Sequence, residues 1–410
     1  MDPEHSPPKP CETAFTPFSL GPVLLKNRFI KCATFEGMTP NGIPGEDLIR
    51  HHRDVAAGGA AMTTVAYCSV TRDGLTFEHQ MHVRAEIEPG LARLCDAVHE
   101  QGCLAALQLG HAGYFASPSA AETKPIGASR VFNLYTLTFP RPMDKGDFQR
   151  LGHAFSKAAD MAVRTGFDAI ELHFGHGYLL SQFLSPYTNR RHDQYGGSLE
   201  NRAKFPLEIL EKVQEVLAGK KVALLIKMNL SDGFDNGLDL DEAVLVASLL
   251  EHKGAHGLVL SGGFVSKTPF YMLRGDVPVQ QMVKNEKNFL RRTGLKMFGR
   301  MFVQEYPFKR MFFFDHALKI RKQVKLPLVL LGGIRSTGDI DRAMSSGFEL
   351  VSMGRPLIHD PDLVKKMRAG IVVESPCEPC NLCVAEMEAG GIRCIHPTLG
   401  EGASSKTITE

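Results

Sequence analysis

The sequence predicts a closed (β/α)8 barrel, and three observations lead to this fold class. Short apolar runs alternate with longer amphipathic patterns along most of the 410 residues. The runs are apolar at nearly every position, as in strands that are buried on both faces of a parallel sheet. About eight strand–helix pairs can be traced, and such a number fits one large barrel domain. An open, doubly wound sheet is the structural alternative, but no G-x-G-x-x-G follows the first strand, so a dinucleotide-binding Rossmann opening is unsupported.

The first four strands and their helices follow from their own residues. The apolar runs are RFIKCA (28–33), AAMTTVAY (60–67), CLAALQL (103–109) and DAIELH (168–173). The helical patterns between and after them span 46–59, 89–102, 147–166 and 198–217. The first two end on glycine, which commonly stops a helix. The pattern at 147–166 is long and amphipathic, and the one at 198–217 starts on Ser198, a good N-cap.

The second half of the barrel has the same alternation. Its strands are predicted at VALLIKM (222–228), HGLVLSGG (256–263), PLVLLGGI (327–334) and ELVSMGR (349–355). Helices are predicted at 241–254, 336–347 and 360–370.

Three segments lie outside this alternation. Residues 1–14 form a polar, proline-rich leader that is expected to be disordered, and the barrel is expected to span 15–370. Residues 264–312 are too long for an ordinary connection and are expected to form a lid or substrate wall. Residues 371–410 form a cysteine-rich extension with a flexible tail.

Composition and charge exclude several classes of partner. The formal net charge is +2, with 47 basic and 45 acidic residues, so neither a nucleic acid nor an anionic membrane is expected as partner. No apolar stretch approaches the ~18 residues of a membrane span. The N-terminus lacks the apolar core of a signal peptide, and a cytoplasmic location is expected.

Functional side chains should gather at the mouth of the barrel, which is the end where the strands terminate. The residues at these positions are Cys32, Ala33, Thr34, Ala66, Gln108, His111, His173, His176, Tyr178, Lys227, Gly262, Gly263, Gly332, Gly333, Gly354 and Arg355. The last two strands both end on glycine, where backbone N–H groups can approach an anion closely, and Arg355 adds a guanidinium. This pattern indicates a phosphate site, although glycines also simply terminate strands.

The other polar groups at the mouth have both functional and structural interpretations. His173 and His176 have no obvious third metal ligand nearby and are interpreted as hydrogen-bond donors, with Tyr178 as a proton donor. A histidine can also merely cap the strand, and the tyrosine can merely pack. Lys227 ends a buried strand, where a lysine can form a Schiff base with a carbonyl substrate or act as a cation beside an electron-rich cofactor.

Three blocks together resemble the Old Yellow Enzyme family of FMN-dependent NAD(P)H:flavin oxidoreductases. They are LQLGHAG (107–113), DAIELHFGHGYLLSQFLSPYTNRRHDQYGGSLENR (168–202) and LGGIRSTGDIDRAMSSGFELVSMGRPLIHDPDL (331–363), and the similarity runs from about residue 15 to residue 370. The resemblance implies an FMN enzyme that reduces activated C=C bonds of α,β-unsaturated carbonyl compounds. Hydride would pass from NAD(P)H to FMN and then to the enone in a ping-pong reaction.

The resemblance also implies a role for each residue at the mouth. Ala33, Thr34 and Ala66 would line the flavin, and Gln108 would hydrogen-bond its pyrimidine ring. Lys227 would lie near flavin N1 and the C2 carbonyl, where a cation stabilises reduced flavin. The phosphate would be bound at Gly333, Gly354 and Arg355. His173 and His176 would bind the carbonyl oxygen of the substrate, and Tyr178 would protonate the α-carbon. Phe35 departs from the pattern, since relatives usually carry a small or polar residue there.

Four cysteines in the extension form a C-x2-C-x2-C-x10-C pattern, made by Cys377, Cys380, Cys383 and Cys394. Four thiolates with this spacing can hold a [4Fe–4S] cluster or one zinc ion, or they can be free thiols that pack the end of the barrel. The segment is similar to the cluster loop of multidomain relatives such as dienoyl-CoA reductase and trimethylamine dehydrogenase. This chain ends soon after Cys394, so no pyridine-nucleotide domain is expected after the loop.

Two other functions are also consistent with the sequence. One is a Schiff-base lyase of the aldolase type that uses Lys227, and it requires that no flavin is bound. The other is a flavin-binding protein without its own turnover, because Phe35 or the insertion at 264–312 blocks the substrate.

Overall fold

Eight parallel strands close into a barrel, which confirms the predicted fold class. The computed structural model describes residues 11–134, 136–286, 292–294, 296–297 and 304–396. Around the barrel the strands follow the order β10-β11-β12-β3-β4-β5-β8-β9. Their bounds are β3 Phe29–Lys31, β4 Met62–Ser69, β5 Leu104–Gly110, β8 Ala169–Phe174, β9 Ala223–Asn229, β10 Gly257–Ser261, β11 Leu328–Leu331 and β12 Leu350–Met353.

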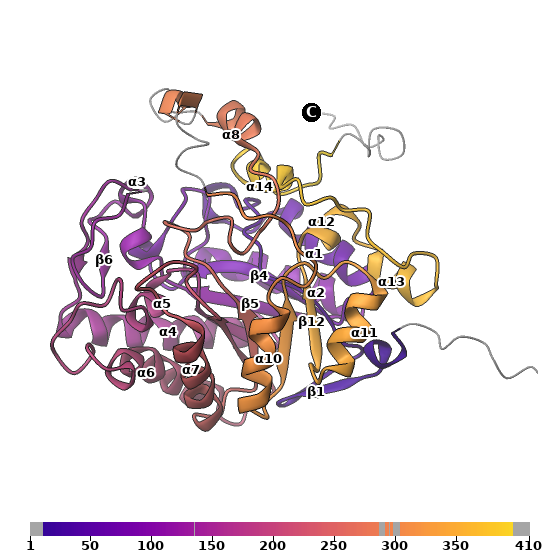
Figure 1. Ribbon diagram of the computed structural model, residues 1–410, viewed down its shortest axis with the longest axis horizontal. Coiled ribbons are helices and arrows are strands. Elements are labelled where there is room, and N and C mark those ends of the chain that lie inside the picture. Colours follow the sequence, from indigo (N-terminus) through magenta and orange to yellow (C-terminus); the bar gives the residue numbers. More distant parts are fainter. Residues whose placement is uncertain (1–10, 135, 287–291, 295, 298–303, 397–410) are drawn as a thin grey trace, which may run out of the picture.

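A helix follows each strand and packs outside the barrel (Figure 1). In chain order these are α1 Glu46–Ala57, α2 Glu88–His99, α4 Lys145–Arg164, α6 Leu199–Leu217, α7 Leu240–His252, α10 Phe314–Gln323, α11 Thr337–Ser345 and α13 Leu363–Arg368. The hydroxyl of Ser198 accepts the N–H of Asn201, so the predicted N-cap of α6 is confirmed. Helix α10 was not among the predicted helices. No helix in the described part of the chain is long and apolar enough to cross a bilayer.

Shorter elements decorate the barrel. They are α3 Pro118–Ala121, α5 Leu179–Leu184, α8 Val279–Asn285, α12 Arg355–His359 and α14 Leu382–Ala385, with the strand pairs β1 Phe18–Leu20 with β2 Val23–Leu25 and β6 Ile126–Gly127 with β7 Arg141–Pro142. The β1–β2 hairpin buries Leu20, Val23 and Leu25 against the barrel interior, and the sequence had not indicated this hairpin.

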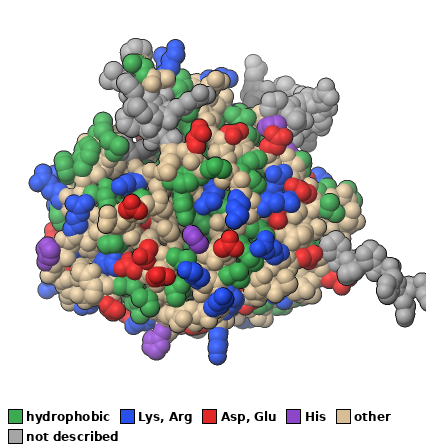
Figure 2. All heavy atoms as spheres, viewed as in Figure 1, with side chains coloured by type: hydrophobic (Ala, Val, Ile, Leu, Met, Phe, Trp, Pro, Cys, Tyr) green, Lys and Arg blue, Asp and Glu red, His purple; other side chains and the backbone are tan. Residues whose placement is uncertain are grey.

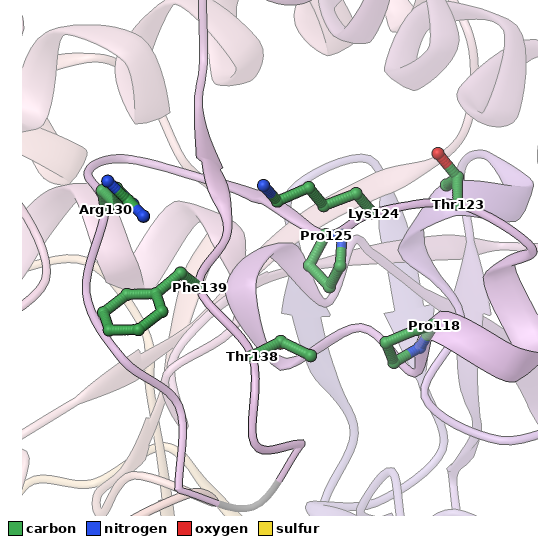
Figure 3. Close-up of a pocket in the computed structure, with 7 residues that line it drawn as sticks. All are labelled: Pro118, Thr123, Lys124, Pro125, Arg130, Thr138 and Phe139. Carbon is green, nitrogen blue, oxygen red and sulfur yellow. The ribbon is translucent and has the colours of Figure 1, made fainter.

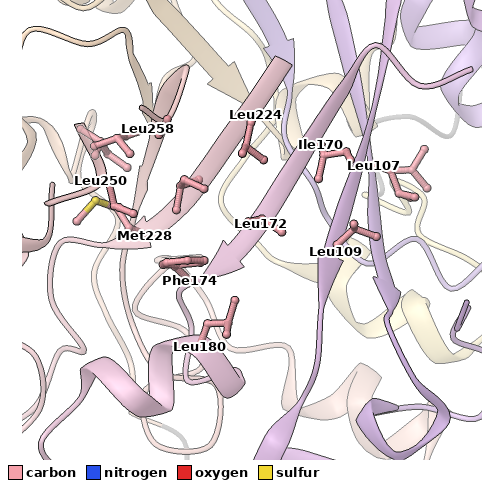
Figure 4. Packing of buried hydrophobic residues seen from close by; sticks show 14 of the residues in the cluster. Leu107, Leu109, Ile170, Leu172, Phe174, Leu180, Leu224, Met228, Leu250 and Leu258 are labelled. Carbon is pink, nitrogen blue, oxygen red and sulfur yellow. The ribbon is translucent and has the colours of Figure 1, made fainter. Parts of the chain in front are cut away.

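The hydrophobic core has two layers, which alternate along every strand. Leu107, Leu109, Ile170 and Leu172 point outward and pack under the helices, as Figure 4 shows. The residues between them point into the barrel, where small and branched side chains such as Ala106, Ala169, Ala223, Leu225 and Val329 fill the lower interior. This alternation decides which strand residues face the mouth, because successive side chains point to opposite faces.

The N-terminal boundary differs from the prediction. Residues 1–10 lie outside the described part, but residues 11–14 pack on the barrel instead of belonging to the leader. Cys11 is 2% exposed, its N–H donates to Asp341 at 2.7 Å, and its thiol donates to the carbonyl of Thr337 at 3.0 Å. These contacts to α11 hold the segment, and they join residues too distant in sequence to be predicted.

The insertion and the cysteine-rich extension pack on each other. Part of the insertion and the tail at 397–410 lie outside the described residues, but α8 lies beside α14 (Figure 1). Gln281 donates to Glu386 at 2.8 Å, and Asn285 donates to the carbonyl of Ala385 at 2.7 Å. On the face seen in Figure 2, basic and acidic side chains are interspersed, as the near-zero net charge leads one to expect.

Candidate active site at the barrel mouth

Four predicted site residues lie on strands and face the inside of the barrel near its mouth. Gln108, His173 and Lys227 follow the interior residues of their strands in steps of two, and each is less than 5% exposed. Ala66 occupies the same face of β4 and is 6% exposed. The register places His173 directly across from Lys227. The structure therefore brings together side chains that are up to 161 positions apart in the sequence.

The two histidines and the tyrosine form one aromatic cluster. The ring centroids of His173 and His176 are 4.9 Å apart with perpendicular planes, and those of His173 and Tyr178 are 4.6 Å apart. Tyr178 precedes α5 as its N-cap and also packs edge-on against Tyr67 at 4.9 Å. These contacts leave three polar groups within one small part of the mouth, as the sequence indicated.

Both histidines are neutral at ordinary pH. Burial holds the pKa of His173 well below its usual range, and the charges of His176 and Lys227 act in the same direction. Burial also lowers the pKa of His176 to about 3, with a further contribution from Lys227. Nδ1 of His173 accepts the N–H of Gly175 at 3.4 Å, so the ring proton of His173 lies on Nε2.

Two polar residues that the sequence analysis missed hold His176. Its φ of +60° is unusual for a residue with a side chain. Asn229 fixes this conformation by accepting the N–H of His176 at 2.9 Å, and Ser261 Oγ lies 2.7 Å from His176 Nε2. The position of Asn229 could have been predicted, because Asn229 follows Lys227 by two positions and therefore lies on the same face of β9.

Lys227 is paired with a carboxylate rather than left free. Its ammonium lies 2.8 Å from Glu171, and both side chains are 3% exposed. An amine held as an ammonium is not a nucleophile, which argues against the Schiff-base interpretation. Glu171 also accepts a hydrogen bond from Gln108 at 2.7 Å. Glu171 was not predicted, although it lies two positions before His173 on the same face of β8.

The residues at the ends of β3 and β12 fit a bound flavin. Ala33, Thr34, Gly354 and Arg355 are half-buried where these paired strands end. The hydroxyl oxygen of Thr34 is buried and has no hydrogen-bond partner among the described residues, so a polar group of a ligand would satisfy it. A Cβ on Gly354 would lie 2.9 Å from the sulfur of Cys32, so only glycine allows this close approach.

The residues predicted to bind phosphate lie where β11 and β12 end. Gly333 has a φ of +78°, which favours glycine, and its backbone follows β11 as expected. The guanidinium of Arg355, however, donates to Asn381 at 2.6 Å and to the carbonyl of Arg274 at 3.0 Å. Its partners come from the insertion and the extension, so these two segments hold the side chain of Arg355.

The departure at Phe35 has a structural explanation. Phe35 stacks on Phe77, with ring centroids 4.8 Å apart and planes 19° apart. The stack joins the loop that follows β3, which contains Phe35, to the loop that follows β4, which contains Phe77.

A buried charged cluster lies behind the same loop. Glu36 accepts from Lys31 at 2.8 Å and from the N–H of Ala66 at 3.2 Å, and His52 lies 3.4 Å away. Glu36, His51 and His52 are close enough to hold a metal ion. The ammonium of Lys31 already neutralises the carboxylate and would repel a metal ion, so we interpret the cluster as structural.

The four cysteines line one cavity, together with Arg355, His359 and His396. Cys394 lies 3.3 Å from His359 Nδ1. The cavity adjoins the loop after β3, since the N–H of Ile392 donates to the carbonyl of Glu36 at 2.7 Å. The extension therefore brings the cysteines close to the mouth of the barrel.

A second, open pocket lies in the excursion between β5 and α4 (Figure 3). Its lining residues are Pro118, Thr123, Lys124, Pro125, Arg130, Thr138 and Phe139. None of the predicted site residues lines this pocket, so it is separate from the candidate active site.

Comparison with known proteins identifies the family of the chain. Residues 13–266 match the NADH:flavin oxidoreductase / NADH oxidase family. The 4,4'-dithiodibutanoate disulfide reductase of Rhodococcus erythropolis is 41% identical over 387 residues, which are 94% of this chain and 95% of the relative. The chain belongs to the NADH:flavin oxidoreductase / NADH oxidase family. Residues 310–375, which contain β11 and β12, also match a histidine biosynthesis protein family.

Other similar proteins are more distant or longer. The NADH oxidase of Thermoanaerobacter brockii is 28% identical over 96% of this chain, which spans 57% of that relative. The structure of a 2-naphthoyl-CoA reductase complex superposes with a TM-score of 0.79 at 24% identity, covering 95% of this chain and 57% of that one. Morphinone reductase superposes with a TM-score of 0.69 at 23% identity, over 90% and 93% of the two chains. These likenesses support the barrel fold.

Membership of this family defines the coarse activity. The protein is an NAD(P)H-dependent oxidoreductase, and its cofactor is FMN. The fit of Thr34 and Gly354 at the mouth agrees with this cofactor.

Proposed function

We propose that the protein reduces the activated C=C bond of small α,β-unsaturated carbonyl compounds, in the cytoplasm, where NAD(P)H is available. The observation that carries the proposal is the pair of neutral histidines beside Tyr178 at the mouth. Neutral imidazoles donate hydrogen bonds to a carbonyl oxygen and stabilise the negative charge that develops on it. Such a site draws electrons from the alkene toward the oxygen.

FMN, when bound, supplies the hydride that it receives from NAD(P)H. His173 and His176 bind the carbonyl oxygen and orient the alkene, and Tyr178 gives its proton to the α-carbon. Gln108 and Lys227 would hold the flavin ring, and Gly333, Gly354 and Arg355 would bind the phosphate. Ala33, Thr34 and Ala66 line the ring. The neutral state of the histidines suits this role, because a charged imidazolium would compete with Tyr178 as acid.

The two half-reactions test the proposal directly. We expect yellow protein whose flavin absorbance is bleached by NAD(P)H and restored by 2-cyclohexenone under anaerobic conditions, as followed by stopped-flow absorbance. Protein that remains colourless after incubation with FMN would contradict it and would favour trapping of Lys227 with borohydride instead. Yellow protein that NAD(P)H does not reduce would indicate a flavin-binding protein without turnover.

A second candidate acceptor is a small disulfide that carries carboxylates. It is favoured by the relative named 4,4'-dithiodibutanoate disulfide reductase, which matches nearly the whole chain. Hydride addition to one sulfur breaks the S–S bond, and a proton on the leaving thiolate completes two thiols. Lys267 offers an exposed cation for a carboxylate, 4.1 Å over the ring of Tyr187 and 4.3 Å from that of Phe234. Phe234 packs in the same aromatic cluster as Tyr178.

The choice between the acceptors follows from reoxidation of the reduced enzyme. Equal concentrations of 2-cyclohexenone and 4,4'-dithiodibutanoate should be mixed with enzyme that NADPH has reduced. Faster reoxidation by the enone supports the first proposal. If only the disulfide reoxidises the flavin, the alkene function is wrong.

We also propose that Cys377, Cys380, Cys383 and Cys394 hold a [4Fe–4S] cluster. Tetrahedral zinc with Zn–S bonds of about 2.3 Å needs sulfurs about 3.8 Å apart. Among the described residues, only Glu36, His51 and His52 bring three such ligand atoms within 4.8 Å of one another. The cysteines line one cavity but are more widely spaced, as a larger group requires, and Arg355 beside them would balance its negative charge.

Metal analysis of anaerobically purified protein tests this proposal. We expect about four iron atoms and four acid-labile sulfides per chain, on the stoichiometry of the cluster. Cys380→Ser should remove most of the iron, whereas Cys103→Ser should leave it, because Cys103 is buried beside β5 and away from the cavity. Protein that contains one zinc and no iron would contradict the proposal.

A further inference from the structure

Glu171 lies at the centre of the polar floor of the mouth. It is 2% exposed, and one oxygen of its carboxylate, Oε1, lies 2.8 Å from Lys227 Nζ and 2.7 Å from Gln108 Nε2. Gln108 and Glu171 face each other directly across the β5–β8 pairing. Gln108 and Lys227 are the two residues assigned to the flavin pyrimidine, and both depend on this one carboxylate.

We infer that Glu171 is a positioning residue that sets the reactivity of the flavin through Lys227 and Gln108. The inference rests on the proposed placement of FMN at the mouth. Glu171 acts in two ways, one through the orientation of the Gln108 amide and the other through the charge of Lys227.

The first action concerns the Gln108 amide. A carboxylate only accepts hydrogen bonds, so the Gln108 group that faces Glu171 is its NH2. The amide oxygen of Gln108 is therefore turned away from Glu171. The flavin pyrimidine presents an N–H donor at N3 beside carbonyl acceptors. Glu171 thus directs the side chain so that Gln108 offers an acceptor where N3 offers a donor.

The second action concerns charge. An unpaired ammonium at 2% exposure is costly to bury, and the Glu171 carboxylate 2.8 Å from Lys227 Nζ offsets that cost. The same carboxylate weakens the positive field that Lys227 exerts on the flavin. Since a cation near N1 stabilises negative charge on that ring, Glu171 limits both the reduction potential and the reactivity of N5 toward nucleophiles.

Sulfite titration of the flavin measures this field, because sulfite adds to N5 and leaves negative charge near N1. Glu171→Gln keeps the size of the side chain and an oxygen acceptor but removes the charge. We expect the variant to bind sulfite roughly tenfold more tightly, because a charge removed within several ångströms in a partly buried site has an effect of this order. The two-electron potential of the flavin should rise by about 30 mV, which is the equivalent of a tenfold change.

Two further variants separate charge from packing. Glu171→Asp keeps the charge, and its sulfite affinity should stay within about twofold of the wild type. Lys227→Gln should weaken sulfite binding, and it decides the question even if Glu171→Gln does not fold. Unchanged sulfite affinity in either glutamine variant with a full content of FMN would overturn the inference, as would an equal shift in Glu171→Asp and Glu171→Gln. Wild-type protein that takes up no FMN would instead remove the proposed function itself.

Discussion

Replacing Tyr178 with phenylalanine is expected to slow reoxidation of the reduced enzyme by a weakly activated enone about 10²–10⁴-fold, the usual contribution of a general acid. The phenol is the proton donor that we propose for the α-carbon, and phenylalanine keeps the ring contacts to His173 and Tyr67. Reduction of the flavin by NAD(P)H should be nearly unchanged, because hydride arrival at the flavin needs no proton from this group. Anaerobic stopped-flow measurement of each half-reaction separates the two effects.

Tyr67 offers a matched control for this experiment. It lies 4.9 Å from Tyr178 between ring centroids and is 4% exposed, but its hydroxyl already donates to the carbonyl of Gly74 at 2.8 Å. Tyr67→Phe should therefore cost some stability and leave the alkene half-reaction within a few-fold of the wild type. If Tyr178→Phe retains the wild-type rate, or if both variants slow it equally, Tyr178 is not the proton donor.

The residues at the ends of the strands could be predicted because local rules place them. A (β/α)8 barrel collects the C-terminal ends of all its strands, and alternation along a strand decides which residues face inward. Gln108, His173 and Lys227 satisfy both conditions, so the apolar runs alone predict that these three side chains lie close together at the mouth. Glu171 and Asn229 satisfy them too, but their partners lie on other segments, so no local pattern shows which site residue each one contacts.

Other features depend on contacts between distant segments and could not be predicted locally. The guanidinium of Arg355 is held by Asn381 and by the carbonyl of Arg274, one in the extension and one in the insertion. Both partners reach the guanidinium only because the insertion and the extension fold over the mouth, and the sequence near Arg355 contains no sign of this. The same holds for Cys11, whose contacts to α11 bridge more than 300 positions.

Replacing either His173 or His176 with alanine is expected to weaken the binding of para-substituted phenols about ten- to a hundredfold. Phenolates mimic the enolate that forms when the alkene is reduced, and a buried hydrogen bond to a charged group contributes about 1.5–3 kcal/mol. The long-wavelength charge-transfer band of the flavin–phenolate complex gives the dissociation constant in a titration. FMN content should stay normal, because β11 and β12 form the proposed phosphate site.

Two comparisons make this prediction specific to the oxygen site. His176→Asn should bind phenols better than His176→Ala, because asparagine tolerates the φ of +60° and keeps a donor, whereas alanine does neither. His99→Ala should leave the phenol affinity unchanged. His99 is partly exposed and pairs with Asp168 at 2.7 Å, and Asp168 directly precedes β8, at the end of that strand away from the mouth.

The pH dependence follows from the lowered histidine pKa values. In the native protein the pKa of His176 is about 3 and that of His173 is well below its usual range, so neither histidine gains a proton between pH 8 and pH 5. Phenol affinity should therefore fall with decreasing pH only as the phenol itself becomes protonated, with no additional step at the ordinary histidine pKa of about 6.5. An imidazolium at the mouth would instead strengthen phenolate binding on acidification through that range.

Unchanged phenol affinity in both alanine variants would remove the histidines from the oxygen site. A joint loss of FMN and stability in both would show that the pair packs the barrel mouth rather than binding substrate.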